Sequence, residues 1–467
     1  MPLVEPLPHA LEYADRWLAY RRWRLRIPGV QVAVRVGGTL VLDSAHGTAD
    51  QATGEALSTR HRFRIASHSK SLAALATMRL VEAGRVRLDD EAQQHVPALA
   101  GTDAGALLVR ELVSHGGGAV RDGDDVAHWH LAADFPDAER LLALARAGVA
   151  RIPASTEFKY SNVGFGLLSL VVEAVTGSSY ADALESLVLA PLGLSATSAD
   201  LPSDPPADLG PLVTGPLVTG HGALHSEAER ATLGSPATGA LAAATGAVST
   251  AAELTDLLRT VTDADDRLLE AASRRRMRQQ LWSTTGRDGS SAGYGLGLML
   301  REIQGRTWVG HGGAWTGQAT RTLVDAERDV VVSVLTNAID GAAEELAVGV
   351  ARIVSTALDP VEAPDDEALA LARSFEGTFS SIWGRVDVVE LGGRLLAIAP
   401  TAADPLQAVD VLTPEDADRV RIAAATGMGS GHELAIAERD ADGRVARWRG
   451  AWHMDAVAAV PGEQRAG

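Results

Sequence analysis

The stretch RFRIASHSKSLAALATMRLVEAG, residues 62–84, holds the feature that decides the fold: a short apolar strand leads directly into a helix that opens on Ser67-His68-Ser69-Lys70. Apolar side chains recur at helical spacing after this tetrad, and Gly84 marks the end of the helix. Residues three apart on a helix share a face, so the side chains of Ser67 and Lys70 point the same way. A serine hydroxyl becomes a good nucleophile when an adjacent base takes its proton, and a lysine can do so if burial lowers its pKa.

The purely structural interpretation of this tetrad is a serine that caps a helix, with a lysine in the first turn. The lysine count favours the functional interpretation. Of the 42 basic residues only two are lysines, Lys70 and Lys159, and the other 40 are arginines. An arginine can replace a lysine where a solvated charge suffices, but a guanidinium does not give up its proton. A lysine retained among so many arginines is therefore a candidate for chemistry, whereas we expect Lys159 to be a solvated or structural charge.

A second candidate group is Tyr160-Ser161-Asn162, which directly precedes an expected helix over residues 163–176. A tyrosine near a cationic amine can be drawn towards phenolate and share the work of a general base, and the amide of Asn162 can hold a substrate carbonyl. The alternative is a helix N-cap beside a buried aromatic ring.

A third group is His311-Gly312-Gly313 followed by Ala314, at the end of an expected strand. Glycines allow a substrate to lie along a strand edge and pair with its backbone. The alternative is a glycine-rich turn with a surface histidine.

In this order and spacing, S-x-x-K, Y-x-N and H-x-G, the chain resembles the serine β-lactamase and penicillin-binding-protein superfamily over residues 10–357. Tyr160 at the second motif places it near the class C β-lactamase, D-aminopeptidase, DD-carboxypeptidase and esterase branch. The resemblance implies a role for each site residue, with His311 standing where most β-lactamases have lysine. It implies that Ser67 is the nucleophile and that Lys70 and Tyr160 transfer its proton. Asn162 would contact the acyl side chain, and His311 and Gly313 would belong to the substrate-binding strand. The N–H groups of Ser67 and Ala314 would form the oxyanion hole.

The order of elements predicts an α/β (α+β) fold, with an antiparallel sheet flanked by helices and an inserted helical region. Strands are expected at 30–34, 39–42, 295–300, 307–310, 320–324 and 330–335, and helices at 10–26, 137–149, 251–261 and 341–357. We expect this domain to span residues 1–358 and a linker to follow at 359–371. Residues 372–467 alternate in short strands, and Phe375-Glu376-Gly377-Thr378-Phe379 resembles the small lipocalin-like β-barrels appended to some peptidases of the superfamily.

Composition narrows the functional classes. The chain has 467 residues, 46% of them hydrophobic, a formal net charge of -18 and no cysteine. The charge disfavours nucleic-acid binding, and the missing thiols exclude disulfides and cysteine-ligated metals. We expect no metal and no cofactor, because the histidines show no metal-binding spacing. Without an expected signal peptide or membrane span, we expect a cytoplasmic enzyme with a small-molecule or short-peptide substrate. The barrel could also build a homo-oligomer.

The sequence thus predicts a metal-free serine hydrolase that works through an acyl-enzyme, with amide or peptide bonds of small or D-amino-acid-containing compounds as the favoured substrates. A carboxylesterase or weak β-lactamase of the same fold is the first alternative. A catalytically silent protein that binds peptides or acyl compounds is the alternative of another class. The stretch GPLVTGPLVTG at 210–220 contains two copies of a five-residue unit. We expect it to belong to a surface excursion over residues 198–240.

Overall fold

The computed structural model describes residues 6–202, 215–225, 229–285, 291–359, 366–423 and 429–460. These residues form two compact units. One runs from Pro28 to Glu344, and the other joins the residues up to Ile27 with those from Glu345 onward, as far as they are described. This grouping puts the first helix and the helix after residue 342 with the C-terminal strands, whereas the domain boundary expected from the sequence lies at 358/359.

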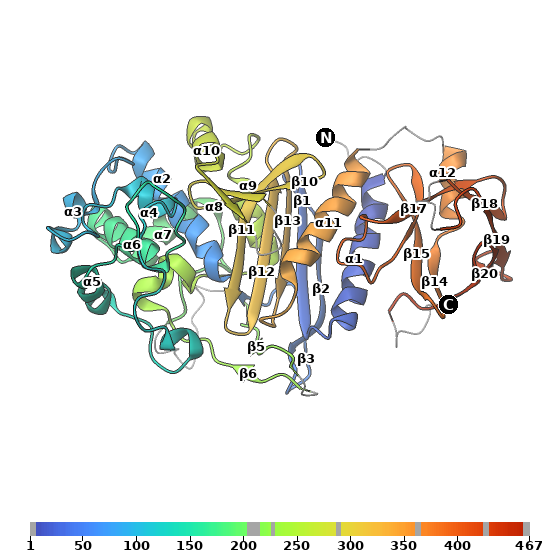
Figure 1. Ribbon diagram of the computed structural model, residues 1–467, viewed down its shortest axis with the longest axis horizontal. Coiled ribbons are helices and arrows are strands. Elements are labelled where there is room, and N and C mark those ends of the chain that lie inside the picture. The colour runs from blue at the N-terminus through green and yellow to red at the C-terminus, as the bar shows by residue number, and fades with distance from the viewer. Residues whose placement is uncertain are drawn as a thin grey trace. The chain divides into compact units, whose positions relative to one another are not determined.

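The first unit is built on a nine-stranded antiparallel sheet (Figure 1). Its central strands β1 and β13 pair from Val30↔Thr336 to Val36↔Val330, and β13 is buried along its whole length because helices or neighbouring strands cover it. The strands lie in the order β3 (Glu55–Ala56), β2 (Thr39–Asp50), β1 (Gly29–Val36), β13 (Val330–Thr336), β12 (Gln318–Asp325), β11 (Arg306–Trp315), β10 (Met299–Ile303), β9 (Ser291–Tyr294), β8 (Trp282–Thr285).

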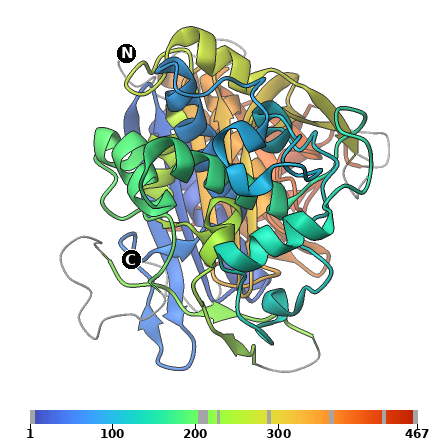
Figure 2. The ribbon, with the colours of Figure 1, turned by 90° about the vertical axis from the view of Figure 1, so that its left-hand side faces the viewer.

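Helices α2 to α8 gather on one face of this sheet, as Figures 1 and 2 show from two directions. Their apolar faces and that of α9, which packs against β1, β12 and β13, form one continuous core with the sheet. The helices are α2 (Ser69–Glu82), α3 (Ala92–His95), α4 (Val109–Val113), α5 (Ala138–Ala147), α6 (Asn162–Thr176), α7 (Tyr180–Leu184), α8 (Ala190–Leu192), α9 (Ala251–Arg259) and α10 (Ala271–Arg278). The antiparallel sheet with flanking helices confirms the fold expected from the sequence.

One expected strand is wrong in its bounds. Residues 295–298 do not continue β10, because Gly297 has a φ of +66° and a Cβ on it would lie 2.4 Å from the Cβ of Ala74. The N–H of Gly297 donates to the carbonyl of Val113 instead of joining the sheet. Within the expected excursion at 198–240, residues 203–214 and 226–228 lie outside the described residues. The described part includes the short pair β5 (Gly220–His221) and β6 (Thr232–Leu233), and β4 (Phe63–Arg64) pairs with β7 (Val248–Ser249).

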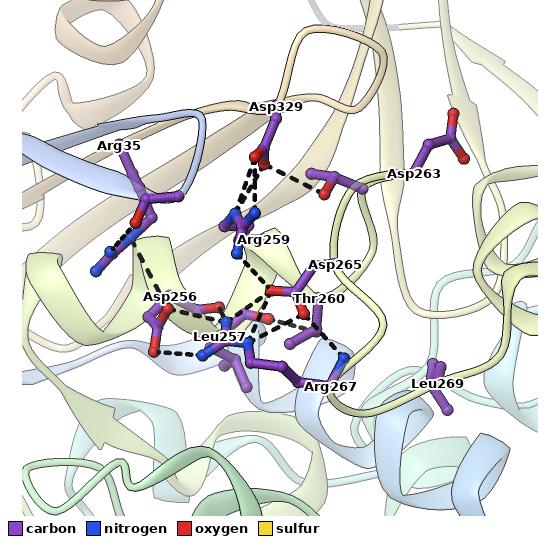
Figure 3. A network of polar contacts seen from close by, with 12 residues as sticks. Arg35, Asp256, Leu257, Arg259, Thr260, Asp263, Asp265, Arg267, Leu269 and Asp329 are labelled. Atoms are coloured by element: carbon purple, nitrogen blue, oxygen red, sulfur yellow. Dashed lines mark hydrogen bonds and ion pairs between the residues drawn. The ribbon is translucent and has the colours of Figure 1, made fainter. Parts of the chain in front are cut away.

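A network of ion pairs joins α9 to the turn between β12 and β13; we call Arg259, Asp256, Asp265, Arg267 and Asp329 the Arg259 cluster (Figure 3). The guanidinium of Arg259 donates to Asp329 Oδ2 at 2.8 Å and to Asp265 Oδ2 at 3.1 Å. Arg267 donates to Asp265 Oδ2 at 2.6 Å and to Asp256 Oδ1 at 2.9 Å. Every cation of the cluster therefore has at least one carboxylate as a direct partner.

The second unit contains a closed barrel, labelled at the red end of the chain in Figure 1. Its interior is filled by aromatic and aliphatic side chains, with Phe375 stacked on Trp448 at 5.8 Å and Phe379 edge-on to the same ring at 5.7 Å. The expected small barrel is confirmed. Its strands are β14 (Gly377–Ser381), β15 (Gly384–Leu391), β16 (Arg394–Ile398), β17 (Val409–Pro414), β18 (Arg419–Ile422), β19 (Leu434–Arg439), β20 (Val445–Gly450) and β21 (Met454–Ala456).

Helices α1 (Pro6–Arg24), α11 (Ala343–Leu358) and α12 (Asp366–Arg373) complete the second unit as described. The hydroxyl of Tyr13 on α1 donates to Asp387 of β15 at 3.3 Å, and His9 lies 2.7 Å from the carboxylate of Glu376. Of the expected linker at 359–371, residues 360–365 lie outside the described residues, and the part from Asp366 is helical.

No single helix among the described residues is both long and apolar enough to span a membrane. The pair α6 with residues Tyr180–Leu192 meets the length and composition criteria only when it is taken together across a bend of 76°. Most of α6 is buried in the core of the first unit.

Candidate active site

Ser67 lies in a 3₁₀ turn, Ala66–His68, that leads into α2. Ala66 has a φ of +47°, a left-handed conformation that costs free energy for any residue with a Cβ. The hydroxyl of Ser69 donates to the carbonyl of Ala66 at 2.6 Å and accepts from the N–H of Ala247 at 2.9 Å. On the other side Gly313 of β11 lies so close that a Cβ would come within 2.2 Å of the carbonyl oxygen of Ile65. The turn is thus held in its strained shape from two directions.

Lys70 is completely buried one turn beyond Ser67. Its Nζ lies 2.7 Å from Asn162 Oδ1, 2.7 Å from the carbonyl oxygen of Ala244 and 3.2 Å from Ser67 Oγ. A neutral amine has two N–H donors and one lone pair, so donation to the two closer oxygens directs the lone pair at Ser67.

The charge state of Lys70 follows from its surroundings. Burial lowers the pKa of its ammonium well below the ordinary 10.5, the negative charge of Asp122 raises it, and the positive charge of Arg121 lowers it further. Loss of solvation is the largest of these effects because, among the described residues, no carboxylate contacts Nζ directly. The amine is therefore available as a base at a pH where an exposed lysine is still charged.

Tyr160 also contacts Ser67, and its hydroxyl donates to Ser67 Oγ at 2.8 Å. The Nζ of Lys70 lies 4.7 Å from the centre of its ring. Burial raises the pKa of Tyr160 above its ordinary value, and the hydrogen bond with Ser67 only partly opposes this. The resting side chain is thus a phenol that can donate a proton, not the phenolate considered from the sequence.

His115 supports this tyrosine from behind. Its ring lies 4.2 Å from that of Tyr160 and 4.9 Å from that of Tyr294, and its Nδ1 accepts from the N–H of Ser161 at 3.1 Å. Burial and the charge of Lys70 keep its pKa well below 6.5, so the ring is neutral. Ser161 itself caps α6 by accepting from the N–H of Gly164 at 2.8 Å. The Tyr160 segment is therefore at once a helix start and one wall of the site.

Asn162 connects Lys70 to an acidic residue that the sequence analysis missed. Its Nδ2 donates to Asp122 Oδ1 at 2.5 Å, and the indole of Trp129 donates to the same oxygen at 2.9 Å. The other carboxylate oxygen of Asp122 lies 3.1 Å from Nε of Arg121. These contacts fix the orientation of the Asn162 amide, so that its oxygen faces Lys70.

His311 is completely buried, and both of its ring nitrogens contact other groups of the protein. Its Nδ1 lies 2.7 Å from the carbonyl oxygen of Gly312 and its Nε2 3.2 Å from the hydroxyl of Tyr294. Burial, and after it the charge of Lys70, lowers its pKa well below 6.5, so this position carries no positive charge. Its neighbour His68 is also neutral, because burial lowers its pKa to about 3.

A cavity of about 730 Å³ in the first unit opens above these groups. Ser67, Tyr160, Asn162, Gly313 and Ala314 all contribute to its wall, together with charged side chains that the sequence analysis did not select. Those are Arg121, Asp122, Arg321, Asp340 and Glu344.

The strand β11 presents a free backbone edge to this cavity. Its pairing with β10 runs only from Ile303↔Arg306 to Met299↔Gly310, whereas its pairing with β12 continues to Trp315↔Gln318. On the side that faces β10, residues 311–315 therefore have no strand partner among the described residues. An extended substrate can form main-chain hydrogen bonds on such an edge.

Of the residues selected from sequence, six lie together: Ser67, Lys70, Tyr160, Asn162, Gly313 and Ala314. His311 lies next to them on β11 but does not reach the cavity wall. The sequence analysis did not select Asp122, His115 or Tyr294. His115 and Tyr294 are each followed directly by glycine, and that pairing of an aromatic ring with glycine was the available signal.

The model of the beta-lactamase family matches residues 14–353 of this chain. The chain belongs to the beta-lactamase family. Members of this family among the similar proteins are serine hydrolases, and this chain is a serine hydrolase of the same fold. Penicillin-binding protein 4 of Amycolatopsis lactamdurans is 31% identical over 354 residues, which are 71% of this chain and 86% of that protein.

Two solved structures show the extent of the shared fold. The octameric penicillin-binding protein homologue from Pyrococcus abyssi has a TM-score of 0.63 at 19% identity and covers 95% of this chain and 99% of its own. The D-amino acid amidase from Ochrobactrum anthropi SV3, solved with D-phenylalanine, has a TM-score of 0.63 at 22% identity and covers 74% of this chain and 99% of its own. Only the first of these likenesses reaches across the barrel. Among the described residues of this family member, no group of three or more metal-ligating side chains could hold a metal ion.

Proposed function

We propose that this enzyme hydrolyses amide or peptide bonds of small or D-amino-acid-containing compounds through an acyl-enzyme on Ser67. The observation that carries the proposal is the position of the Lys70 amine, buried without a direct carboxylate partner and 3.2 Å from Ser67 Oγ. A neutral amine at this place can take the serine proton while the hydroxyl attacks.

Acylation begins when Ser67 Oγ transfers its proton to Lys70 Nζ and forms a bond with the substrate carbonyl carbon. The N–H groups of Ser67 and Ala314 are proposed to hold the oxygen that becomes negative. Tyr160 gives its phenolic proton to the leaving nitrogen as the C–N bond breaks, and it regains a proton from the Lys70 ammonium. The amine product leaves, and the acyl group stays on Ser67 as an ester.

Deacylation uses the same groups with water in place of the amine. The water gives a proton to the Lys70 amine and its oxygen attacks the ester carbon. Tyr160 returns a proton to Ser67 Oγ as the ester bond breaks and regains one from the Lys70 ammonium, so the products are a carboxylic acid and the original enzyme. Because its pKa is raised, Tyr160 holds its proton in the resting enzyme and has it to deliver in both half-reactions.

Two observations favour amides with an uncharged group beside β11. A neutral His311 offers no cation for a substrate carboxylate, which also disfavours efficient β-lactam turnover. The shared fold with a D-amino acid amidase supports amide substrates of D-configured compounds. We propose that Asn162 contacts the acyl side chain, and that His311 sets the shape of the β11 edge through Gly312 and Tyr294 without touching the substrate itself.

The test compares hydrolysis of D-alanine p-nitroanilide with that of a short-chain p-nitrophenyl ester, with Ser67→Ala as the blank. Turnover of the anilide that disappears in the variant supports the proposal. Turnover of the ester alone would assign a carboxylesterase instead. If neither compound reacts faster than in the blank, the alternative of a catalytically silent binder gains support and a broader screen of acyl donors is needed.

The assembly of the chain is a separate proposal. Its likeness to an octameric homologue across the barrel supports formation of a homo-oligomer. Light scattering of the full chain in solution tests it, and a monomeric mass at all concentrations would contradict it.

A further inference from the structure

One end of the C-terminal barrel contains a cavity of about 1210 Å³, larger than the one beside Ser67. It is bounded by the β14–β15 hairpin, the end of β16, the start of β17 and the connection from β20 to β21. The barrel interior below it is filled by Phe375, Phe379 and Trp448, so the space is confined to the mouth. Mouths of β-barrels are common places for small-molecule sites.

The rim of this mouth carries two hydrophobic side chains in full contact with solvent. Ile382 and Trp383 form the two-residue turn of the β14–β15 hairpin and are 94% and 91% exposed. The other exposed large hydrophobic side chains of the described chain are only 37–44% exposed. Tight hairpin turns favour glycine, asparagine and aspartate, so the turn itself does not explain these residues.

A second tryptophan extends the apolar lining of the cavity. Trp452 lies between β20 and β21, packs edge-on to Trp448 at 5.6 Å and contributes to the cavity wall. Val386, Ile398 and Met454 add aliphatic surface to the same wall. The mouth thus offers two indole rings and several aliphatic groups to a single occupant.

The wall contains three charged residues, Arg385, Asp410 and Asp455, and Asp410 lies on β17 opposite Ala397 of β16. Its carboxylate is half-buried and has no ion-pair or hydrogen-bond partner among the described residues. Burial raises its pKa, as expected for a carboxylate that water solvates incompletely. The other two charged side chains of the wall have partners. Arg385 donates to the carbonyl of Ala458 at 2.6 Å, and Asp455 pairs with Arg447.

We propose that the barrel mouth is a binding site for a small amphipathic cation, a primary amine on an aromatic or aliphatic body. The ammonium would pair with Asp410, and the body would lie between Trp383 and Trp452. Indole rings attract both apolar groups and cations, so the lining and the carboxylate favour the same ligand. The proposal is independent of the chemistry at Ser67.

Isothermal titration calorimetry of the full chain tests this site with three probes that share one body: 4-phenylbutylamine, 4-phenylbutan-1-ol and 4-phenylbutanoate. We expect saturable binding of the amine at one site, weaker binding of the alcohol and weakest binding of the acid. Asp410→Asn should weaken amine binding by about 10- to 100-fold, in line with a hydrogen bond to a charged group. Trp383→Ala should weaken amine and alcohol alike.

Two controls place the effect at the barrel mouth. Glu433→Gln removes a carboxylate from an exposed position outside the cavity wall and should leave amine binding unchanged. Ser67→Ala should also leave it unchanged, because that site lies in the other unit. Circular dichroism shows whether Asp410→Asn folds; if it does not, the ratio of amine to alcohol affinity on the unaltered chain decides.

Three results would overturn the proposal. The first is no saturable heat with the amine at concentrations up to millimolar. The second is equal amine affinity of the unaltered chain and Asp410→Asn, or equal affinity for amine and alcohol. The third is a change of oligomeric mass on Trp383→Ala without amine binding, which would assign the rim to a contact between copies of the chain.

Discussion

The Lys70 site and the Arg259 cluster are two groups of polar side chains in the same unit, and they affect the pKa values of their cations in opposite directions. Lys70 is completely buried, whereas the side chains of Arg259 and Arg267 are 17% and 39% exposed. In the Arg259 cluster each guanidinium faces a carboxylate, and the hydrogen bonds that Arg259 donates to Asp329 and Arg267 donates to Asp265 raise the pKa values of these arginines (Figure 3). At Lys70 the nearest polar groups are a hydroxyl, an amide and a carbonyl, all uncharged, so burial dominates and lowers the pKa.

The difference teaches that burial and the charge of the nearest acceptor together decide whether a cation is structural or reactive. Burial costs a cation the free energy of its hydration. A neutral oxygen orients the cation but offsets little of this cost, whereas the attraction of a carboxylate offsets most of it. Asp122 shows the intermediate case. It lies one hydrogen bond away from Lys70, behind Asn162, and so moderates the pKa without holding the proton in place.

The largest expected effect comes from giving the Lys70 site a cation that cannot lose its proton. Lys70→Arg should keep the fold and lower kcat/KM by roughly 10⁴-fold, the upper range for a general base. The matched control is Lys159→Arg, which changes the other lysine and should leave turnover unchanged. Steady-state kinetics on the better of the two nitrophenyl substrates measures both, and full activity of Lys70→Arg would place Lys70 with the structural cations.

Removal of the neighbouring hydroxyl should have a slightly smaller effect. Tyr160→Phe deletes the donor to Ser67 Oγ and keeps the ring that packs on His115. We expect a fall in kcat of roughly 10²- to 10³-fold with little change in thermal stability. Turnover close to that of the unaltered enzyme would assign Tyr160 to packing alone.

The Arg259 cluster should respond in stability and not in catalysis. Asp329→Asn keeps the shape of the side chain and tolerates the φ of +53° at this position, but it leaves Arg259 without a charged partner there. Loss of one partner of a largely buried pair predicts a fall of about 3 kcal/mol in the free energy of unfolding. Denaturant unfolding of the variant measures it, and kcat/KM should stay within about twofold. A stable variant with impaired turnover would reverse the roles of the two clusters.

The smallest effects are shifts in pH dependence from the residues that modify Lys70 at a distance. Because the base must be neutral, kcat/KM should rise as pH passes the pKa of Lys70 and level off well below pH 10.5. Asp122→Asn removes a charge that favours the ammonium, so the rise should move to lower pH. Arg121→Gln removes a charge that disfavours it, so the rise should move to higher pH. Shifts in the same direction for both variants would contradict this electrostatic account.

The sequence predicted the parts of this site that depend on local spacing. Ser67 and Lys70 are one turn apart on one element, and the Tyr160 motif directly precedes α6, so each could be placed from neighbouring residues. Contacts between distant segments could not be predicted in this way. The carbonyl of Ala244 that holds Lys70 lies 174 residues away from it, and Asp122 lies 40 residues from Asn162.

Burial was the other property that the pattern of residues left open. A histidine in a glycine-rich strand can face solvent or core, and only the packing of Tyr294 and the 3₁₀ turn Ala66–His68 against β11 places His311 inside. The strand expected at 295–300 failed for a related reason, since Gly297 is held by its close approach to Ala74 of α2. The helix α12 lies at the end of the expected linker. Its alanines and leucines favour a helix, but this is the only sign of it in the sequence.

The central claim, that burial keeps Lys70 uncharged enough to act as a base, can be measured directly because the chain has only two lysines. In Lys159→Arg labelled with ¹³C-lysine, the single remaining Cε resonance reports the titration of Lys70. The account predicts a midpoint well below the ordinary 10.5 in the folded protein, returning to that value on unfolding. A midpoint near 10.5 in the folded enzyme would show that Lys70 stays charged and would contradict the proposed mechanism.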